Sequence, residues 1–244
     1  MTIPEPARVG FGAGADAYAR ARPSYPADAV SYVAARLPES PVVLDLAAGT
    51  GIFTTLLRPF AQRLIAVEPV ESMRVKIADA DEVLDGTAES IPLADASVDA
   101  VAVAQAFHWF RFDEALAEIA RVLRPGGVLA LLWNRRDESV PWVAEMSSAM
   151  QWREHQISSY DRTDWPSVIG RSGLFGAVEH ARFSWEHMLD RAGLADRVRS
   201  VSYIAAMDEA NRESVVARVL ALAADFDEPF PLPYNTLVWC TTRS

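Results

Sequence analysis

Hydrophobic residues in the first half of the chain follow two alternating patterns. Short runs of adjacent Val, Ile, Leu and Ala are typical of strands buried on both faces of a sheet. Between the runs, apolar residues recur every three or four positions, which is the spacing of one helix face. The runs predict strands over 41–47, 63–69, 82–88, 98–106 and 128–134, and the spaced segments predict helices over 52–61, 71–80 and 113–123. This alternation predicts an α/β fold with a mostly parallel, doubly wound sheet.

The second half of the chain is richer in helical patterns. We expect helices over 141–155, 189–206 and 208–224, and strands over 178–187 and 231–243. No repeat, low-complexity linker or break in composition divides the sequence, so we expect a single domain over residues 1–244. Residues 141–175 and 188–226 are expected to form a helical cover beside the sheet.

Composition and charge narrow the class of protein. The 244 residues include 33 acidic and 23 basic side chains, a net charge of −10, which argues against a nucleic-acid partner. The sequence has no polybasic run that would bind an anionic membrane, no apolar stretch near the roughly 18 residues of a membrane span, and no secretory signal at its start. Its one cysteine, Cys240, excludes an intrachain disulfide. We expect a soluble, cytoplasmic protein that binds neither membrane nor nucleic acid; its oligomeric state is left open.

The segment VLDLAAGTG (43–51) carries the strongest local pattern. A strand ends in a glycine turn and a helix follows at once, so Gly49 and Gly51 allow positive φ and a close approach of backbone to ligand. Open α/β sheets bind ligands at the carboxyl ends of their strands. Glu68 ends the next strand, where a carboxylate accepts hydrogen bonds from the hydroxyls of a ribose. These features predict a nucleoside-containing cofactor.

Two observations bear on which nucleoside it is. The run from Gly49 to Thr54 resembles a dinucleotide fingerprint in which threonine replaces the third glycine. Asp45 stands just before the turn, where a carboxylate suits an ammonium group and would repel a pyrophosphate. The pattern favours adenosine linked to an amino acid, and a nicotinamide dinucleotide remains the alternative.

Several segments together resemble the class I S-adenosylmethionine-dependent methyltransferases, in the methyltransferase type 11 group. The matching pieces are YARARPSYP (18–26), VLDLAAGTG (43–51), AVEPVESM (66–73), GTAESIPLADASVDAVAVAQAFHWF (86–110) and RVLRPGGVLALLWN (121–134). Within the group, the chain is similar to small-molecule methyltransferases of the trans-aconitate type. The resemblance implies a Rossmann-like sheet of seven strands in the order 3-2-1-4-5-7-6, with the last strand antiparallel. It also implies that residues 1–40 contain a cofactor-covering segment and a helix, and that 41–137 form the cofactor-binding core.

The resemblance further assigns residues to S-adenosylmethionine. Arg22 would pair with the cofactor carboxylate, since a guanidinium binds a carboxylate bidentately. Ala47 stands where many relatives have a first glycine, and Thr87 where many have aspartate. The cofactor-binding residues it implies are Tyr18, Arg22, Tyr25, Asp45, Ala47, Gly49, Gly51, Glu68, Met73, Thr87, Ala88, Glu89 and Gln105.

Aromatic and polar residues after two strands predict the acceptor pocket. They are Phe107, His108, Trp109, Trp133, Asn134 and Arg135. His108 is the candidate catalytic residue, as general base or substrate orienter, because imidazole titrates near neutrality; a hydrogen-bonded structural role is the alternative. Arg135 or Arg136 would bind a substrate carboxylate or form a surface ion pair. The histidines and carboxylates lack metal-ligand spacing, so no metal site is expected.

The predicted function is methyl transfer to a small molecule by in-line displacement, with O-methylation of a carboxylate or hydroxyl favoured. The segment AQAFH (104–108) lacks the polar-Pro-Pro-aromatic motif of enzymes that methylate nucleic-acid bases, which agrees with the acidic charge. Two alternatives are a nicotinamide-dependent oxidoreductase and a cofactor-binding module without catalysis.

Overall fold

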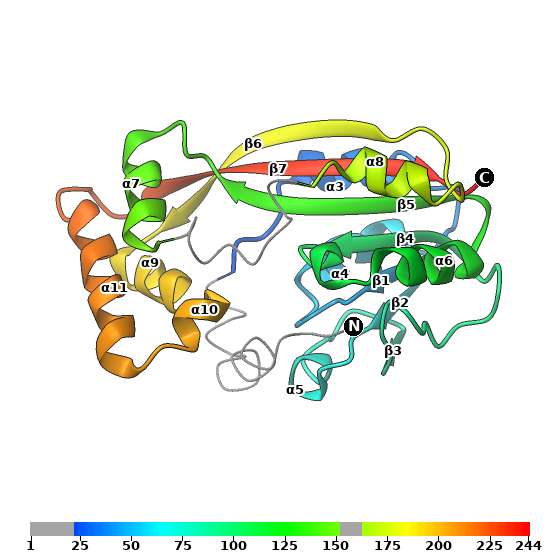
Figure 1. The fold of residues 1–244 in the computed structure, drawn as a ribbon, viewed down its shortest axis with the longest axis horizontal. Helices are drawn as coiled ribbons and strands as arrows, with labels where there is room; N and C mark the ends of the chain where they lie inside the picture. Colours follow the sequence, from blue (N-terminus) through cyan, green and yellow to red (C-terminus); the bar gives the residue numbers. More distant parts are fainter. Residues whose placement is uncertain (1–21, 152–162) are drawn as a thin grey trace.

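The computed structural model describes residues 22–151 and 163–244, and in this part of the chain seven strands form one sheet (Figure 1). The spatial order is β3-β2-β1-β4-β5-β7-β6. The strands are β1 Val42–Leu46, β2 Arg63–Val67, β3 Glu82–Leu84, β4 Val98–Ala104, β5 Leu123–Arg136, β6 Glu179–Leu189 and β7 Phe230–Thr242.

The pairing of the strands confirms the predicted topology. β1 to β5 pair in parallel, whereas β7 is antiparallel to both β5 and β6. Asp45 is in register with Ala66 of β2 and Ala102 of β4, so three strands end side by side. The strand order reverses between β1 and β4, which is where open α/β sheets bind ligands.

Helices cover both faces of the sheet. On one face, α3 (Ala27–Ala34) and α4 (Ile52–Leu57) pack on alternate residues of the central strands. On the other, α6 (Phe112–Val122) and α8 (Trp165–Arg171) enclose a larger core that includes Phe107 and Trp133. Burial on both faces is the reason that the parallel strands consist of continuous apolar runs.

A third hydrophobic cluster lies beyond the carboxyl end of β5 (Figure 1). It joins α7, α9, α10 and α11 to the first part of β7, and we refer to these four helices as the helical cover. Their bounds are α7 Pro141–Ala149, α9 Arg191–Arg199, α10 Ser202–Ala205 and α11 Glu209–Leu222. None of the helices in the described ranges is long and apolar enough to cross a membrane.

Two helices predicted in the first half of the chain are shorter than their patterns indicate. The helix predicted over 71–80 is a single turn, α5 (Glu71–Arg74). The chain leaves it because Ile77 packs against Gly51 and the Asp81 N–H donates to the carbonyl of Leu64, which starts β3. The helix predicted over 52–61 ends at Leu57 and continues as a 3₁₀ turn, Arg58–Phe60, that contains a proline.

Differences in the second half have similar local causes. The helix predicted over 189–206 begins after Asp190, whose side chain caps Gly193, and divides into α9 and α10. The helix predicted over 141–155 ends at Ala149, and 152–155 lie outside the described residues. β5 begins at Leu123 and not at 128, because Leu123 pairs with Val98 across a register shift.

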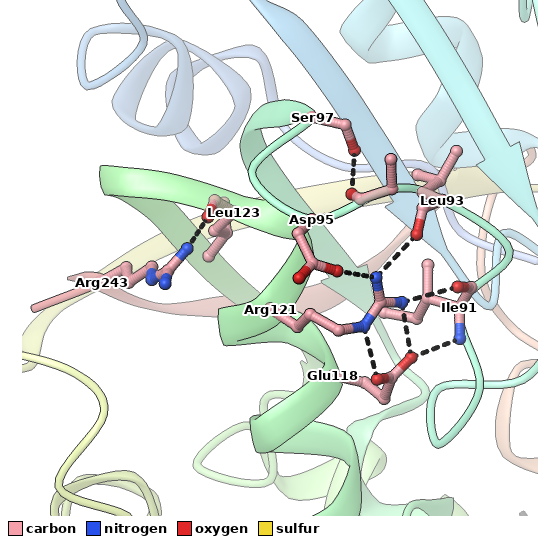
Figure 2. A network of polar contacts seen from close by, with 9 residues as sticks. Ile91, Leu93, Asp95, Ser97, Glu118, Arg121, Leu123 and Arg243 are labelled. Carbon is pink, nitrogen blue, oxygen red and sulfur yellow. Dashed lines mark hydrogen bonds and ion pairs between the residues drawn. The ribbon is translucent and has the colours of Figure 1, made fainter.

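The loop before β4 is held on α6 by the guanidinium of Arg121 (Figure 2). Its nitrogens donate to both carboxylate oxygens of Glu118, to Asp95, and to the carbonyls of Ile91 and Leu93, at 2.7 to 2.9 Å. The Ile91 N–H donates back to Glu118 at 2.9 Å. Five donated hydrogen bonds use the full donor capacity of an arginine. The network fixes the loop that follows Thr87, Ala88 and Glu89.

Candidate active site

A cavity opens at the carboxyl ends of β1, β2 and β4, where the topology predicts a ligand site. Ten of the residues expected in the site line it: Arg22, Tyr25, Asp45, Ala47, Gly49, Glu68, Met73, Gln105, Trp109 and Asn134. The cavity walls also include Pro23, Ala48, Thr50, Ile52, Phe53, Val70, Ala104 and Ala106. The tertiary structure therefore brings residues from five segments of the sequence to one place.

Asp45 is a fully buried carboxyl group at the end of β1. Its Oδ2 accepts a hydrogen bond from the Thr54 hydroxyl at 2.6 Å, whereas Oδ1 has no partner among the described residues. Burial raises the pKa of Asp45 from 3.8 to about 7; the Thr54 hydrogen bond opposes this rise, and the nearby charge of Glu68 adds to it. A buried oxygen left without a partner beside a cavity is suited to a cationic donor.

Glu68 ends β2 and is also buried, with an exposed fraction of 4%. The N–H groups of Gly49 and Val70 donate to its two carboxylate oxygens at 2.9 and 2.8 Å. Burial raises the pKa of Glu68, and these two hydrogen bonds counteract the rise. Each oxygen keeps a further lone pair for a ligand, so the carboxylate both ties the glycine turn to β2 and presents acceptors to the cavity.

The turn after β1 has left-handed backbone at three positions. Ala47, Gly49 and Gly51 have φ values of 58°, 60° and 87°. A Cβ on Gly49 would meet no atom within 4 Å, because that direction is open. A Cβ on Gly51 would lie 3.3 Å from the Cα of Ile77, and Gly51 is not among the cavity-lining residues. Gly51 therefore serves close packing of the turn, and Ala47 carries strain at the site.

The segment before α3 lies across the cavity. Arg22 and Tyr25 line it, and Tyr25 makes an edge-to-face contact with Phe53 at 4.9 Å. The side-chain amide of Asn134, at the end of β5, donates to the Ser24 carbonyl at 2.8 Å and fixes this segment. Tyr18 lies outside the described residues.

The end of β4 supplies a second strained position and two aromatic groups. Gln105 has a φ of 59°, and its side-chain amide donates to the Asn134 carbonyl at 3.0 Å. Trp109 lines the cavity, and the His108 ring lies 4.7 Å from it. Burial, followed by the positive charge of Arg22, lowers the pKa of His108 from 6.5 to about 4. His108 is therefore a neutral and weakly basic imidazole at pH 7.

The remaining predicted residues lie elsewhere. Ala88 is buried in the core, Thr87 bridges to Ser90, and the Glu89 carboxylate accepts the Arg111 N–H at 2.9 Å. Phe107 and Trp133 are fully buried and pack on Trp165, at 5.5 and 4.8 Å between ring centres. Arg135 is exposed. None of these residues is among those that line the cavity.

Sequence reasoning missed three residues that shape the site. Thr54 orients Asp45, and Ile77 packs on the glycine turn. Thr50 lines the cavity, and its buried hydroxyl has no partner among the described residues. The position of Thr50 between two glycines was a usable indication, whereas the Ile77 contact depends on how the helix after β2 ends.

The sheet order, with a cavity at the carboxyl ends of β1, β2 and β4, is that of a class I S-adenosylmethionine-dependent methyltransferase. Residues 44–131 match a family model described as a methyltransferase domain. An uncharacterised methyltransferase of Mycobacterium tuberculosis is 39% identical over 237 residues, 93% of both chains. A methyltransferase-like protein of Schizosaccharomyces pombe is 34% identical over 213 residues, 84% of this chain and 82% of the relative. The chain belongs to this methyltransferase family.

Solved structures agree with the family at the level of the fold. A structure from Anaeromyxobacter dehalogenans, described as a type II methyltransferase, is 25% identical with a TM-score of 0.67. The match covers 91% of this chain and 97% of that one. The finer likeness to trans-aconitate enzymes remains a prediction.

Proposed function

We propose that this methyltransferase transfers the methyl group of S-adenosylmethionine to a small molecule, with O-methylation of a carboxylate or hydroxyl favoured. The observation that carries the proposal concerns Asp45, which lines the cavity. Its buried Oδ1 has no hydrogen-bond partner among the described residues. An ammonium group of the cofactor's amino acid would satisfy this oxygen and compensate its burial.

The other cavity residues fit the rest of the same cofactor. Arg22 brings a guanidinium for the carboxylate of the amino acid, opposite in charge to Asp45. Glu68 retains lone pairs for the ribose hydroxyls, and Met73 adds a buried apolar wall suited to the adenine. The open direction at Gly49 leaves room for backbone approach. Cationic and anionic groups in one cavity suit a zwitterionic amino acid better than a dinucleotide pyrophosphate.

Bound S-adenosylmethionine supplies a methyl group on a sulfonium, which leaves as a neutral thioether. The protein therefore has to position the acceptor in line with that methyl group and keep water away, and positioning contributes up to roughly 7–11 kcal/mol in favourable cases. Trp109 and Gln105, which follow β4 and line the cavity, would contact the acceptor there. A carboxylate acceptor is already ionised at pH 7 and needs no base.

The environment of His108 favours a carboxylate over a hydroxyl acceptor. With a pKa of about 4, His108 accepts a proton weakly from a hydroxyl group, whose own pKa is far higher. We therefore assign His108 an orienting role beside Trp109.

We also propose that the chain is one methyltransferase domain over 1–244, with 141–175 and 188–226 as the acceptor cover. We propose further that the protein acts in the cytoplasm without a nucleic-acid or membrane partner.

Binding and transfer assays test the proposal. Calorimetry should detect S-adenosylhomocysteine binding and no NAD binding; the reverse result refutes the proposal in favour of a nicotinamide enzyme. Transfer of radiolabelled methyl should then be measured on panels of carboxylic acids, phenols and amines, and we expect the acids to be the substrates. Tight cofactor binding with no transfer to any panel would favour a binding module without catalysis.

A further inference from the structure

Arg197, in α9 of the helical cover, is a buried cation without an acidic partner among the described residues. Its exposed fraction is 6%. Its Nε donates to the Tyr234 hydroxyl at 3.1 Å and its Nη1 to the Ser200 hydroxyl at 3.2 Å. Both partners are neutral. Arg121, by contrast, directs its donors to two carboxylates and two carbonyls (Figure 2).

The incomplete pairing of Arg197 is informative because a buried charge costs stability unless it is paired. A guanidinium has five N–H donors, and the hydrogen bonds of Arg197 to Tyr234 and Ser200 use two of them. Donors on Nη1 and Nη2 form the edge that binds a carboxylate bidentately. The side chain therefore matches a ligand carboxylate better than it matches its protein surroundings.

A second arginine, Arg136, lies next to this group. It is in register with Tyr234 across β5 and β7, and its Nε donates to the Ser147 hydroxyl at 3.3 Å. Burial lowers the pKa of Arg136; Tyr234 opposes this change, the charge of Arg197 adds to it, and Tyr203 and Glu138 oppose it more weakly. The positive charges of Arg136 and Arg197 therefore lie near each other, so the surroundings of Arg197 are positive.

His187 of β6 adds a neutral donor to the same group. Its ring centre lies 6.3 Å from that of Tyr234, and its buried Nδ1 has no partner among the described residues. Burial lowers the pKa of His187, and the charge of Arg197 lowers it further. A neutral imidazole still offers one N–H to a ligand.

The group lies beside the cofactor cavity. Side chains alternate along a strand, so Arg136 is on the same side of β5 as Asn134, two residues before it. Asn134 lines the cavity, and its Oδ1 accepts the Thr236 hydroxyl of β7. The end of β5 points toward the helical cover (Figure 1). Arg197, which contacts Tyr234 opposite Arg136, therefore lies beyond the end of β5 that borders the cavity.

We propose that Arg197, positioned by Tyr234 and flanked by Arg136 and His187, binds a carboxylate of the methyl acceptor. This inference rests on the proposed function and names its substrate class: small molecules that carry a carboxylate. Neutral molecules of the same shape are rejected, because they would bring no charge opposite to that of Arg197 into its buried surroundings.

The test uses the full chain saturated with S-adenosylhomocysteine, whose affinity is measured first on every variant. Acetate, succinate and benzoate are then titrated by calorimetry, with their amides as neutral probes of matched shape. We expect the wild-type protein to bind one or more of the carboxylates and none of the amides. Arg197→Gln should weaken carboxylate binding by about 10- to 100-fold and leave the affinity for S-adenosylhomocysteine unchanged.

Controls separate this role from a structural one. Arg218→Gln removes an exposed arginine of α11, whose contacts are a serine hydroxyl and a carbonyl, and should leave carboxylate binding unchanged. Arg197→Lys keeps the charge without the fork and should bind carboxylates with intermediate affinity. Because a poorly compensated buried cation is removed, Arg197→Gln should melt no lower than the wild-type protein.

Each other outcome overturns the inference. It fails if the wild-type complex binds no carboxylate, if amides bind as well as carboxylates, or if Arg197→Gln keeps full carboxylate affinity. A lower melting temperature of Arg197→Gln together with unchanged carboxylate binding would assign Arg197 a structural role. Failure of every variant, wild type included, to bind S-adenosylhomocysteine would instead refute the proposed function.

Discussion

The substitution Asp45→Asn should make the protein more stable and less able to bind its cofactor. Asn keeps the shape of the side chain and still accepts the hydrogen bond from Thr54, which is 2.6 Å long in the wild-type protein. It removes the negative charge that burial disfavours and that an ammonium group would compensate. Stability and cofactor affinity therefore change in opposite directions, which ordinary damage to the core would not produce.

The magnitude follows from the pKa of Asp45, which is about 7 in the folded protein and 3.8 when unperturbed. Between these pH values the folded state holds a proton that the unfolded state has lost, so the free energy of unfolding falls as pH rises. At about 1.36 kcal/mol per pH unit, the fall is roughly 4 kcal/mol at most. Asn does not ionise, so the variant does not lose this free energy of unfolding. It buries a new amide donor instead, which costs about 1–3 kcal/mol. The variant should therefore gain roughly 1–3 kcal/mol at pH 8.

Cofactor affinity should follow the ionisation of the same group. With a pKa of about 7, wild-type Asp45 is mostly protonated at pH 6 and mostly ionised at pH 8, so the affinity for S-adenosylhomocysteine should rise about tenfold between them. Asp45→Asn should remove this dependence and weaken binding at pH 8 by about 10- to 100-fold, the range for a lost hydrogen bond to a charged group.

Calorimetry at pH 6 and pH 8 and thermal unfolding at the same pH values measure both effects. Asp28→Asn, in the exposed first turn of α3, is the matched control and should change neither quantity. Equal wild-type affinity at the two pH values would show that the charge of Asp45 does not bind the cofactor. Asp45→Asn melting lower at pH 8 while binding the cofactor normally would show the same.

Three further substitutions probe the cavity. Gly49→Val should abolish S-adenosylhomocysteine binding in calorimetry, because its side chain enters the open direction beside the turn at a φ of 60°; unchanged affinity in a folded variant would contradict this. Glu68→Ala should weaken binding by roughly 1–3 kcal/mol, since ribose and the Gly49 N–H lose their acceptor; a smaller change would place Glu68 outside the ribose site. His108→Asn should not change the pH dependence of kcat/KM between pH 6 and 8, because the pKa of His108 is about 4 and its protonation occurs below this range. A wild-type inflection near pH 6.5 that the variant abolishes would restore His108 as a general base.

Local sequence patterns determined most of the fold. The apolar runs that became β1, β2, β4 and β5 are continuous because helices bury both faces of those strands, and this burial constrains composition directly. Helix lengths were less predictable. The pattern over 71–80 is compatible with a helix, but the packing of Ile77 on Gly51 ends α5 after Arg74. Such a contact joins residues from different elements, and periodicity does not report it.

The candidate site also contains residues that the sequence predicted correctly to line the cavity, whereas other predicted residues lie elsewhere in the structure. Asp45, Gly49 and Glu68 lie within short segments whose order and spacing are visible in the chain, and the cavity includes all three. Phe107 and Trp133 were expected in the acceptor pocket because they follow or end strands at the correct edge. The structure buries both against Trp165. Trp133 points away from the cavity because alternate residues of β5 point to opposite faces, and Phe107 lies in a 3₁₀ turn, Phe107–Trp109, that directs it into the core.

The sequence by itself determined the α/β class and the glycine turn after β1, because each is a local feature of neighbouring residues, and the strand order followed from the resemblance to a family. Only the tertiary structure decided that one buried oxygen of Asp45 has no partner among the described residues, that His108 is neutral, and that Arg197 donates to Tyr234. Desolvation and charge pairing depend on which distant segments surround a group. The properties that decide chemistry therefore follow from packing among residues far apart in the chain.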